Sequence, residues 1–169
     1  MEQKRNEDQL IDPNEMENAK EIALRFLAYR DRTSAEVRDH LTGKGIDRAA
    51  ADAVVGGLVE AKILDDADLC LRLIRYAMER KKGRQRIARE LAQKGLPQDL
   101  IHDLLESEYP KEEELAAAKA QAERSLTQKG ETGAPTKNDL ARVSRRLAAQ
   151  GFSTDIIYRT ISDLTRIYP

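Results

Sequence analysis

The chain has 169 residues, of which 40% are hydrophobic and 35% charged, and its formal net charge is −1. With one cysteine it cannot form an internal disulfide, and no stretch approaches the roughly 20 apolar residues of a membrane-spanning helix. The aromatic content is only 4%, with no tryptophan, which favours an all-α protein with aliphatic cores. We expect a cytoplasmic protein with no membrane contact and no disulfide framework.

The sequence of residues 1–64 predicts a tail followed by three helices. Residues 1–15 are polar and contain Pro13, so we expect a mobile N-terminal tail. Apolar residues then recur every three or four positions, as they do along one face of a helix. Helix-starting residues follow at Thr33, which opens a capping box, and at Asp47. Together these signals predict a three-helix repeat over residues 16–64.

The same pattern returns twice. Residues 65–110 predict a second three-helix repeat, in which Pro97 starts the third helix. Residues 111–169 predict a third repeat that begins with an alanine-rich helix. Glycine and proline interrupt it over residues 129–135, which predicts an internal loop, and Thr136 has the sequence of a helix start.

Three glycines put the repeats in register. Gly45, Gly95 and Gly151 are separated by 50 and 56 residues, and a leucine precedes each glycine by four positions. A hydrophobic residue follows each one, as in Schellman endings, where the glycine adopts a left-handed conformation. Tandem repeats of this length pack mainly on their neighbours, so we expect an elongated array of three three-helix repeats.

Positive charge is concentrated in the second helix of the second repeat. The segment from Arg80 to Gly95 holds seven basic residues and the single acid Glu90. The position six residues before the aligned glycine is Asp39 in the first repeat, and it is an arginine in the other two. A charged helix face is most often only solvated, but this reversal favours a binding role. The candidate partner-binding residues are Lys81, Lys82, Arg84, Arg86, Arg89, Lys94, Arg142, Arg145 and Arg146.

Nothing in the sequence predicts an enzyme. His40 and His102 lie in different repeats, and Cys70 has no obvious base partner. No zinc-ligand spacing or glycine-rich phosphate loop occurs, so we expect no metal and no cofactor. The two histidines are expected at the surface or at helix flanks, and the cysteine is expected to pack in a core.

The order and spacing of several motifs resemble the RecX family of bacterial recombination regulators, over roughly residue 19 to the C-terminus. The motifs are Thr33-Ser34-x-Glu36-Val37, Leu41-x-x-Lys44-Gly45, Leu64-Asp65-Asp66 and Lys82-Gly83-x-x-x-Ile87-x-x-Glu90-Leu91-x-x-Lys94-Gly95. The third repeat departs from the pattern, because Gln150 stands where the other repeats have a lysine before the glycine.

The helical array predicts a monomer, and the resemblance implies that it binds the RecA recombinase filament. It further implies modulation of the filament's ATPase, strand-exchange and coprotease activities, with inhibition of these activities expected, and through them an effect on recombination, DNA repair and the SOS response. The candidate partner-binding residues could contact phosphates of single- or double-stranded DNA, an acidic protein surface, or both. The alternative is a DNA-binding regulator, because short helices joined by a glycine turn resemble a helix-turn-helix.

Overall fold

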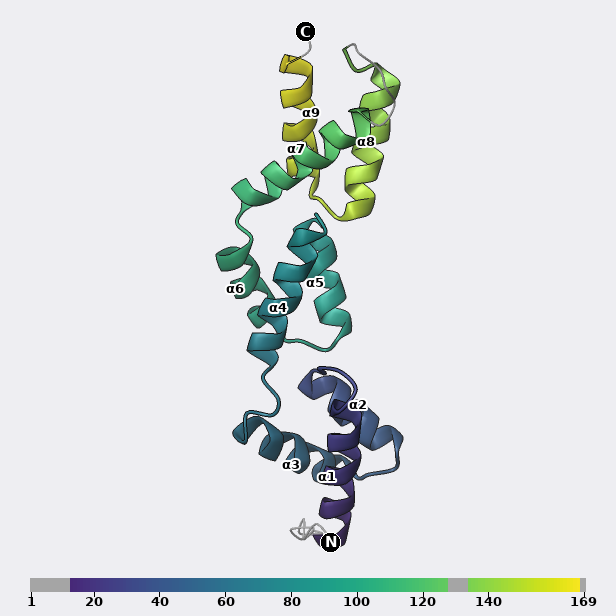
Figure 1. The fold of residues 1–169 in the computed structure, drawn as a ribbon, viewed down its shortest axis with the longest axis vertical. Helices are drawn as coiled ribbons and strands as arrows, with labels where there is room; N and C mark the ends of the chain where they lie inside the picture. Colours follow the sequence, from purple (N-terminus) through teal and green to yellow (C-terminus); the bar gives the residue numbers. More distant parts are fainter. Residues whose placement is uncertain (1–12, 128–133, 168–169) are drawn as a thin grey trace, which may run out of the picture. The chain divides into compact units, whose positions relative to one another are not determined.

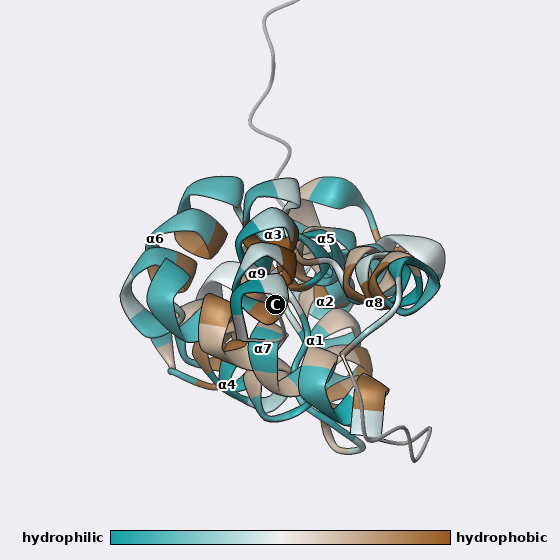
Figure 2. Cartoon of the chain, turned by 90° about the horizontal axis from the view of Figure 1, so that it is seen from above, coloured by the Kyte–Doolittle hydropathy of each residue, from teal (hydrophilic) through white to brown (hydrophobic). Residues whose placement is uncertain are grey.

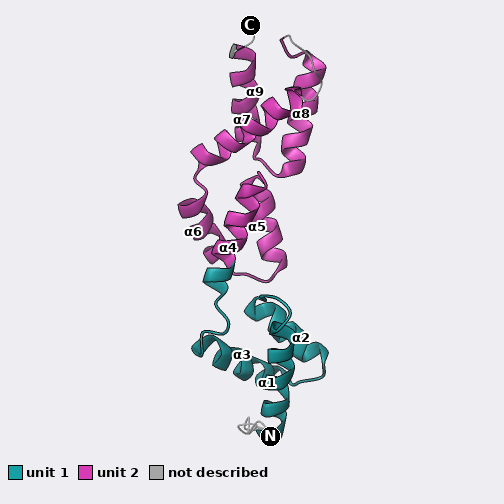
Figure 3. Cartoon of the chain, viewed as in Figure 1, with its two compact units in different colours: residues 1–69 teal, residues 70–169 magenta. Residues whose placement is uncertain are grey.

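The computed structural model describes residues 13–127 and 134–167, and over these residues the chain is entirely helical outside its turns (Figure 1). The helices of this described part are α1 Pro13–Leu27, α2 Ser34–Gly43, α3 Arg48–Glu60, α4 Asp66–Glu79, α5 Arg84–Gln93, α6 Gln98–Glu108, α7 Lys111–Thr127, α8 Lys137–Gln150 and α9 Thr154–Ile167. The prediction of an all-α helical repeat is confirmed. The chain divides into two compact units, residues 1–69 and 70–169 (Figure 3).

The first helix begins earlier than its apolar period indicated. Pro13 is the first residue of α1 instead of part of the predicted tail. Proline suits this position, because its missing N–H would lack an intrahelical acceptor there and its fixed φ is already helical. Most of that tail, and most of the loop predicted over 129–135, lies outside the described residues.

Unit 1 has a core built by α1, α2 and α3. Small residues line the buried side of α1, where Ala19 and Ala23 are completely buried, so that α2 and α3 can pack closely on it. The other core residues are Val37, Leu41, Ile46, Ala50, Ala51, Val54, Val55, Leu58 and Leu64. Within the described part of this unit, no charged side chain is buried in the core.

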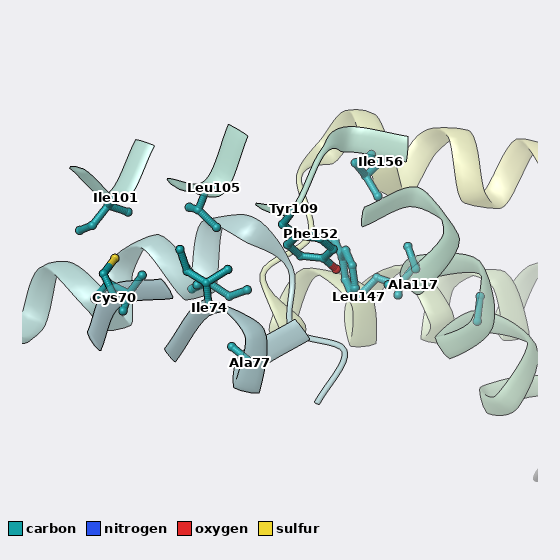
Figure 4. Close-up of a cluster of buried hydrophobic side chains, with 14 of the residues drawn as sticks. Cys70, Ile74, Ala77, Ile101, Leu105, Tyr109, Ala117, Leu147, Phe152 and Ile156 are labelled. Atoms are coloured by element: carbon teal, nitrogen blue, oxygen red, sulfur yellow. The ribbon is translucent and has the colours of Figure 1, made fainter. Parts of the chain in front are cut away.

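Unit 2 buries the second and third repeats in one continuous core. Ile74 and Leu105 belong to the second repeat, and Leu147 and Ile156 belong to the third, yet they are members of the same buried cluster. Figure 4 shows Tyr109 and Phe152 lying between these two groups. The helix α6 turns its hydrophobic residues inward and presents a hydrophilic outer surface (Figure 2). Two predicted repeats therefore fold as a single body.

The three glycine endings are confirmed and nearly identical. Gly45, Gly95 and Gly151 have φ values of 87°, 76° and 84°. In each repeat a leucine stands four positions before the glycine, and its carbonyl accepts a hydrogen bond from the N–H of the residue after the glycine. The three distances are 3.2, 3.4 and 3.1 Å. These are the six-to-one bonds of Schellman endings.

The predicted helix starts are confirmed as well. Thr33 and Thr136 each cap a helix, and a carboxylate three residues later bonds back to the backbone N–H of the threonine. The side chain of Asp47 accepts a hydrogen bond from the N–H of Ala49. Local sequence signals therefore fix most helix boundaries.

Leu91 provides a test of which face of α5 is buried. Leu91→Ala is expected to lower the free energy of unfolding by about 2–5 kcal/mol, because it leaves a cavity beside Ile87 and Leu96 in the core. Arg89→Ala, on the exposed side of the same helix, should change it by less than about 0.5 kcal/mol. Urea unfolding followed by circular dichroism measures both variants. Equal losses would mean that the helix faces are reversed.

Candidate partner-binding surface

The third repeat holds the start of α5, the helix with the basic sequence. The N–H of Gly83 donates to the carbonyl of Gln150 at 2.9 Å, and the N–H of Gln85 donates to the carbonyl of Gly151 at 3.2 Å. The N–H of Arg84 donates to the carboxylate of Glu114 at 2.8 Å. Because the first N–H groups of a helix have no partner within it, these three acceptors satisfy groups that would otherwise be unpaired. The basic helix is thereby fixed to α7 and α8.

The backbones of the two repeats touch at this junction. A Cβ atom added to Gly83 would lie 2.3 Å from the backbone of Gly151, and one added to Gly151 would lie 2.3 Å from the Cβ of Arg86. Only glycine permits this approach. The helix α8 therefore ends directly against the beginning of α5, as Figure 1 shows, and the basic residues of both helices belong to one body.

Glu114 is a structural residue of this junction that sequence reasoning missed. It is almost completely buried, and burial raises the pKa of its carboxyl group, while the hydrogen bond from Arg84 acts in the opposite direction. Within unit 1 the N–H of Ser34, the first residue of α2, donates to the carboxylate of Asp66 at 2.8 Å. Asp66 opens α4 and Glu114 lies in the first turn of α7, so in each case the helix that begins the next repeat supplies the acceptor. The missed signal is the four-residue spacing of Glu114, Ala118 and Ala122, which places an acid on a buried stripe.

This bond predicts how Glu114 variants behave. Glu114→Ala should lower the free energy of unfolding by about 1–3 kcal/mol, because the N–H of Arg84 loses its acceptor in a partly buried place. Glu114→Gln keeps an acceptor oxygen and should cost less than about 1 kcal/mol.

The pH dependence of the same pair has a definite sign. Because the folded-state pKa of Glu114 is raised, the native state binds the proton more tightly than the unfolded state does. Its contribution to stability therefore falls as the pH rises from the ordinary glutamate pKa, about 4.3, through the raised one. The stability of the wild type relative to Glu114→Gln should decline over that window in urea titrations. A difference that does not change with pH would contradict the assignment.

The structure divides the nine predicted partner-binding residues into two groups. The first group is held by internal partners. Glu90 accepts from Lys82 at 2.6 Å and from Arg86 at 2.9 Å, and these hydrogen bonds, Lys82 first, lower its pKa. Arg84 pairs with Glu106 and lowers the pKa of that carboxyl.

Two arginines of α8 also have internal partners. Arg142 lies 3.1 Å from the carboxylate of Asp139, which is itself buried in the capping box of α8. Arg146 donates to the hydroxyl of Ser125 at 3.4 Å, although much of its side chain is exposed. The basic residues of α5 and α8 form what we call the basic face. The internally paired residues contribute positive charge to this face, whether or not they contact a partner.

The second group faces solvent. Lys81, Arg89 and Arg145 are exposed and have no ion-pair partner among the described residues, whereas Lys94 is half-buried. Lys81 lies in the turn before α5 with a φ of 55°. Arg89 and Arg145 occupy the same aligned position in the second and third repeats, so they are the clearest candidates for contact with an anionic partner.

The first repeat differs at the equivalent positions. Asp39 is exposed, as expected, and aligns with Arg89 and Arg145. Glu36 is not a free acidic group, because it completes the capping box of α2 and lies 3.6 Å from Arg30 and 3.8 Å from Arg32. The charge reversal between repeats therefore rests mainly on the Asp39 position.

The residues considered for catalysis take structural places. Cys70 is completely buried in the core of unit 2, and His102 is exposed beside Asp103. His40 is not a simple surface residue, because its ring stacks on that of Phe26, and burial is the main cause of its lowered pKa. Among the described residues, no three histidine, cysteine, aspartate or glutamate side chains gather to hold a metal ion. No helix in this part of the chain is long and apolar enough to cross a membrane.

These features define a tandem helical-repeat protein with a basic face on two connected repeats. Comparison with known proteins identifies its relatives: the RecX first three-helix domain matches residues 19–58, and the RecX second three-helix domain matches residues 65–105. The regulatory protein RecX of Halorhodospira halophila is 31% identical over 140 residues, which cover 82% of this chain and 83% of that protein. The chain belongs to the RecX family.

Other relatives extend beyond the matched region. The regulatory protein RecX of Bacillus licheniformis is 33% identical over 144 residues, which cover 83% of this chain and 53% of that protein. The chain thus spans about half the length of that relative, and 56% of the one from Geobacillus kaustophilus. The crystal structure of RecX from Lactobacillus salivarius has the same fold, with a TM-score of 0.79 at 24% identity, covering 90% of this chain and 97% of that one.

Proposed function

We propose that this chain is a non-enzymatic regulator that binds the RecA recombinase filament in the cytoplasm and lowers its ATPase, strand-exchange and coprotease activities. Membership of the RecX family supports the kind of function. The observation that carries the site is the pair Arg89 and Arg145, exposed at the same repeat position on two helices that meet end to end in one body. Such a pair presents two positive charges in a fixed relation.

The continuous core of unit 2 makes the arrangement suitable for a regular polymer. A nucleoprotein filament repeats its acidic surfaces and its phosphates at fixed intervals, so a binding surface with fixed charge spacing loses little conformational entropy on contact. The bonds from Gly83, Arg84 and Gln85 to the third repeat provide that fixed spacing. We infer that one monomer engages the filament through its second and third repeats together.

Direct action on DNA is the alternative function. The basic face could bind phosphates without reading bases, and its affinity would then fall steeply with salt. Against a helix-turn-helix interpretation, Gly45, Gly95 and Gly151 end helices in Schellman motifs, which are general helix endings.

Two titrations separate these functions. Labelled protein is titrated with preformed RecA filaments on single-stranded DNA, and separately with the same DNA without RecA. The proposal predicts tighter binding to the filament by at least about tenfold, and inhibition of its ATPase at matching concentrations. Equal affinity for naked DNA would favour the alternative.

A further inference from the structure

A small pocket lies between α4 and α5, on the same basic part of unit 2. Its cavity volume is about 130 Å³. The floor is aliphatic and is formed by Leu73, Ala77, Ile87 and Leu91. Small-molecule sites occupy roughly 300–1,000 Å³, so this cavity has room for one side chain and not for a cofactor.

The first repeat fills the corresponding place with its own side chains. The ring of Phe26 on α1 stacks on that of His40 on α2, with centroids 3.9 Å apart and an angle of 4° between the planes. The guanidinium of Arg32 lies 4.0 Å from the centroid of the same Phe26 ring. The gap between the first two helices of that repeat is thus closed by an aromatic side chain.

Burial shows which residues of α4 correspond to α1. Ala19 and Ala23 of α1 are completely buried, and so are Cys70 and Ile74 of α4, which fixes an offset of 51 residues between these helices. Phe26 then corresponds to Ala77. The first repeat therefore has one residue more than the second between these helices, and the second repeat makes the shorter connection through a turn in which Lys81 has a φ of 55°.

The second helices correspond at an offset of 50 residues, as the aligned glycines require. His40 therefore corresponds to Glu90, and Arg32 corresponds to Lys82. In the second repeat alanine replaces the aromatic ring and glutamate replaces its stacking partner. The pocket is the space that these two replacements leave open.

The rim of the pocket is positively charged. Lys82, Glu90 and Lys94 line it, and Glu90 is already neutralised by ion pairs with both Lys82 and Arg86. Tyr76 forms another wall, and the guanidinium of Arg80 lies 4.4 Å from its ring centroid. The two lysines of the lining outweigh its one glutamate, so the pocket favours an apolar group that has acidic neighbours.

We propose that this pocket binds one apolar side chain of a partner protein, leucine or phenylalanine, carried on a segment with acidic residues on both sides. The inference rests on the proposed function, since it names the kind of contact that a protein partner would make with this basic surface. The aliphatic floor favours a protein side chain over a nucleobase, which would need an open aromatic face. The ring of Tyr76 already carries Arg80.

The test uses the full chain and synthetic peptides labelled with fluorescein. One peptide has a central leucine between aspartate and glutamate residues, and its control has alanine in place of the leucine. In anisotropy titrations the leucine peptide should bind at least about tenfold more tightly than the alanine peptide. Equal binding would overturn the proposal, because charge alone would then explain it.

Closing the pocket provides the matched variant. Ala77→Phe combined with Glu90→His recreates the ring pair of the first repeat and should abolish the preference for leucine. Ala77→Leu is a smaller filling variant in case the double variant does not fold, which circular dichroism would report. Retention of the leucine preference in a folded, filled variant would contradict the proposal. The proposal would also be contradicted if a labelled single-stranded DNA bound the wild type more tightly than it bound the filled variant.

These results can be distinguished from failure of the proposed function. If the wild type binds RecA filaments but shows no preference for the leucine peptide, the proposed function stands and the pocket proposal fails. If the wild type prefers the leucine peptide but does not bind RecA filaments, the pocket proposal stands and the proposed function fails.

Discussion

Gly151→Ala is expected to lower the free energy of unfolding of unit 2 by about 2–5 kcal/mol. Two costs combine. An alanine at a φ of 84° is strained by about 1–2 kcal/mol. Its Cβ would also lie 2.3 Å from the Cβ of Arg86, and forcing apart packed groups costs about 1–3 kcal/mol. Urea unfolding followed by circular dichroism measures the loss.

Unit 1 contains a matched control. Gly45 has a φ of 87°, but a Cβ added there would have no heavy atom within 4 Å. Gly45→Ala should therefore show the cost of the backbone conformation alone, about 1–2 kcal/mol. Gly83→Ala shows the other cost alone, because its φ of −75° is ordinary and its Cβ would meet the backbone of Gly151. If Gly151→Ala lost no more free energy than Gly45→Ala, and Gly83→Ala lost almost none, the contact between the second and third repeats would have no energetic importance.

Much of this fold follows from local sequence. The three glycine endings and the capping boxes at Thr33 and Thr136 depend on residues within one helical turn, so the sequence predicts them directly. The buried Leu91 and Ile87 follow from the helical period. The resemblance to the RecX family depends on the order of the same motifs, and the family match confirms it.

Contacts between repeats are less accessible to such reasoning. The hydrogen bond from Arg84 to Glu114 joins residues that are 30 positions apart, and no periodicity links them. Gly83 looks like an ordinary loop glycine until Gly151 is placed against it. The internal ion pairs of Lys82, Arg84 and Arg86 could not be predicted either, because a helical wheel shows which face is exposed but not which acidic side chains approach it. The sequence therefore predicts the basic face and not the smaller set of side chains that remain available.

Replacing both Arg89 and Arg145 with glutamate is expected to weaken binding to RecA filaments by about tenfold to a hundredfold, because each attraction becomes a repulsion. Both side chains are exposed and have no ion-pair partner among the described residues, so the fold should not change. The salt dependence should also become shallower, by roughly one unit of slope for each phosphate that the variant no longer neutralises. Filament binding over a salt series measures both effects.

The control changes charge at the aligned position of the first repeat. Asp39→Arg removes an exposed acid, and it does not disturb the capping box that a change at Glu36 would break. It raises the net charge by two, whereas the paired reversal lowers it by four. If position matters more than total charge, this variant should bind within about twofold of the wild type.

Binding of preformed RecA filaments by the wild type, the Arg89→Glu/Arg145→Glu variant and Asp39→Arg over one salt series is the most direct test of the central claim. Circular dichroism first establishes that all three proteins are folded. The account predicts strongly weakened binding and a shallower salt slope for the paired reversal only. An unchanged affinity of the paired variant, or an equal change in the Asp39→Arg variant, would contradict the assignment of the second and third repeats as the binding surface.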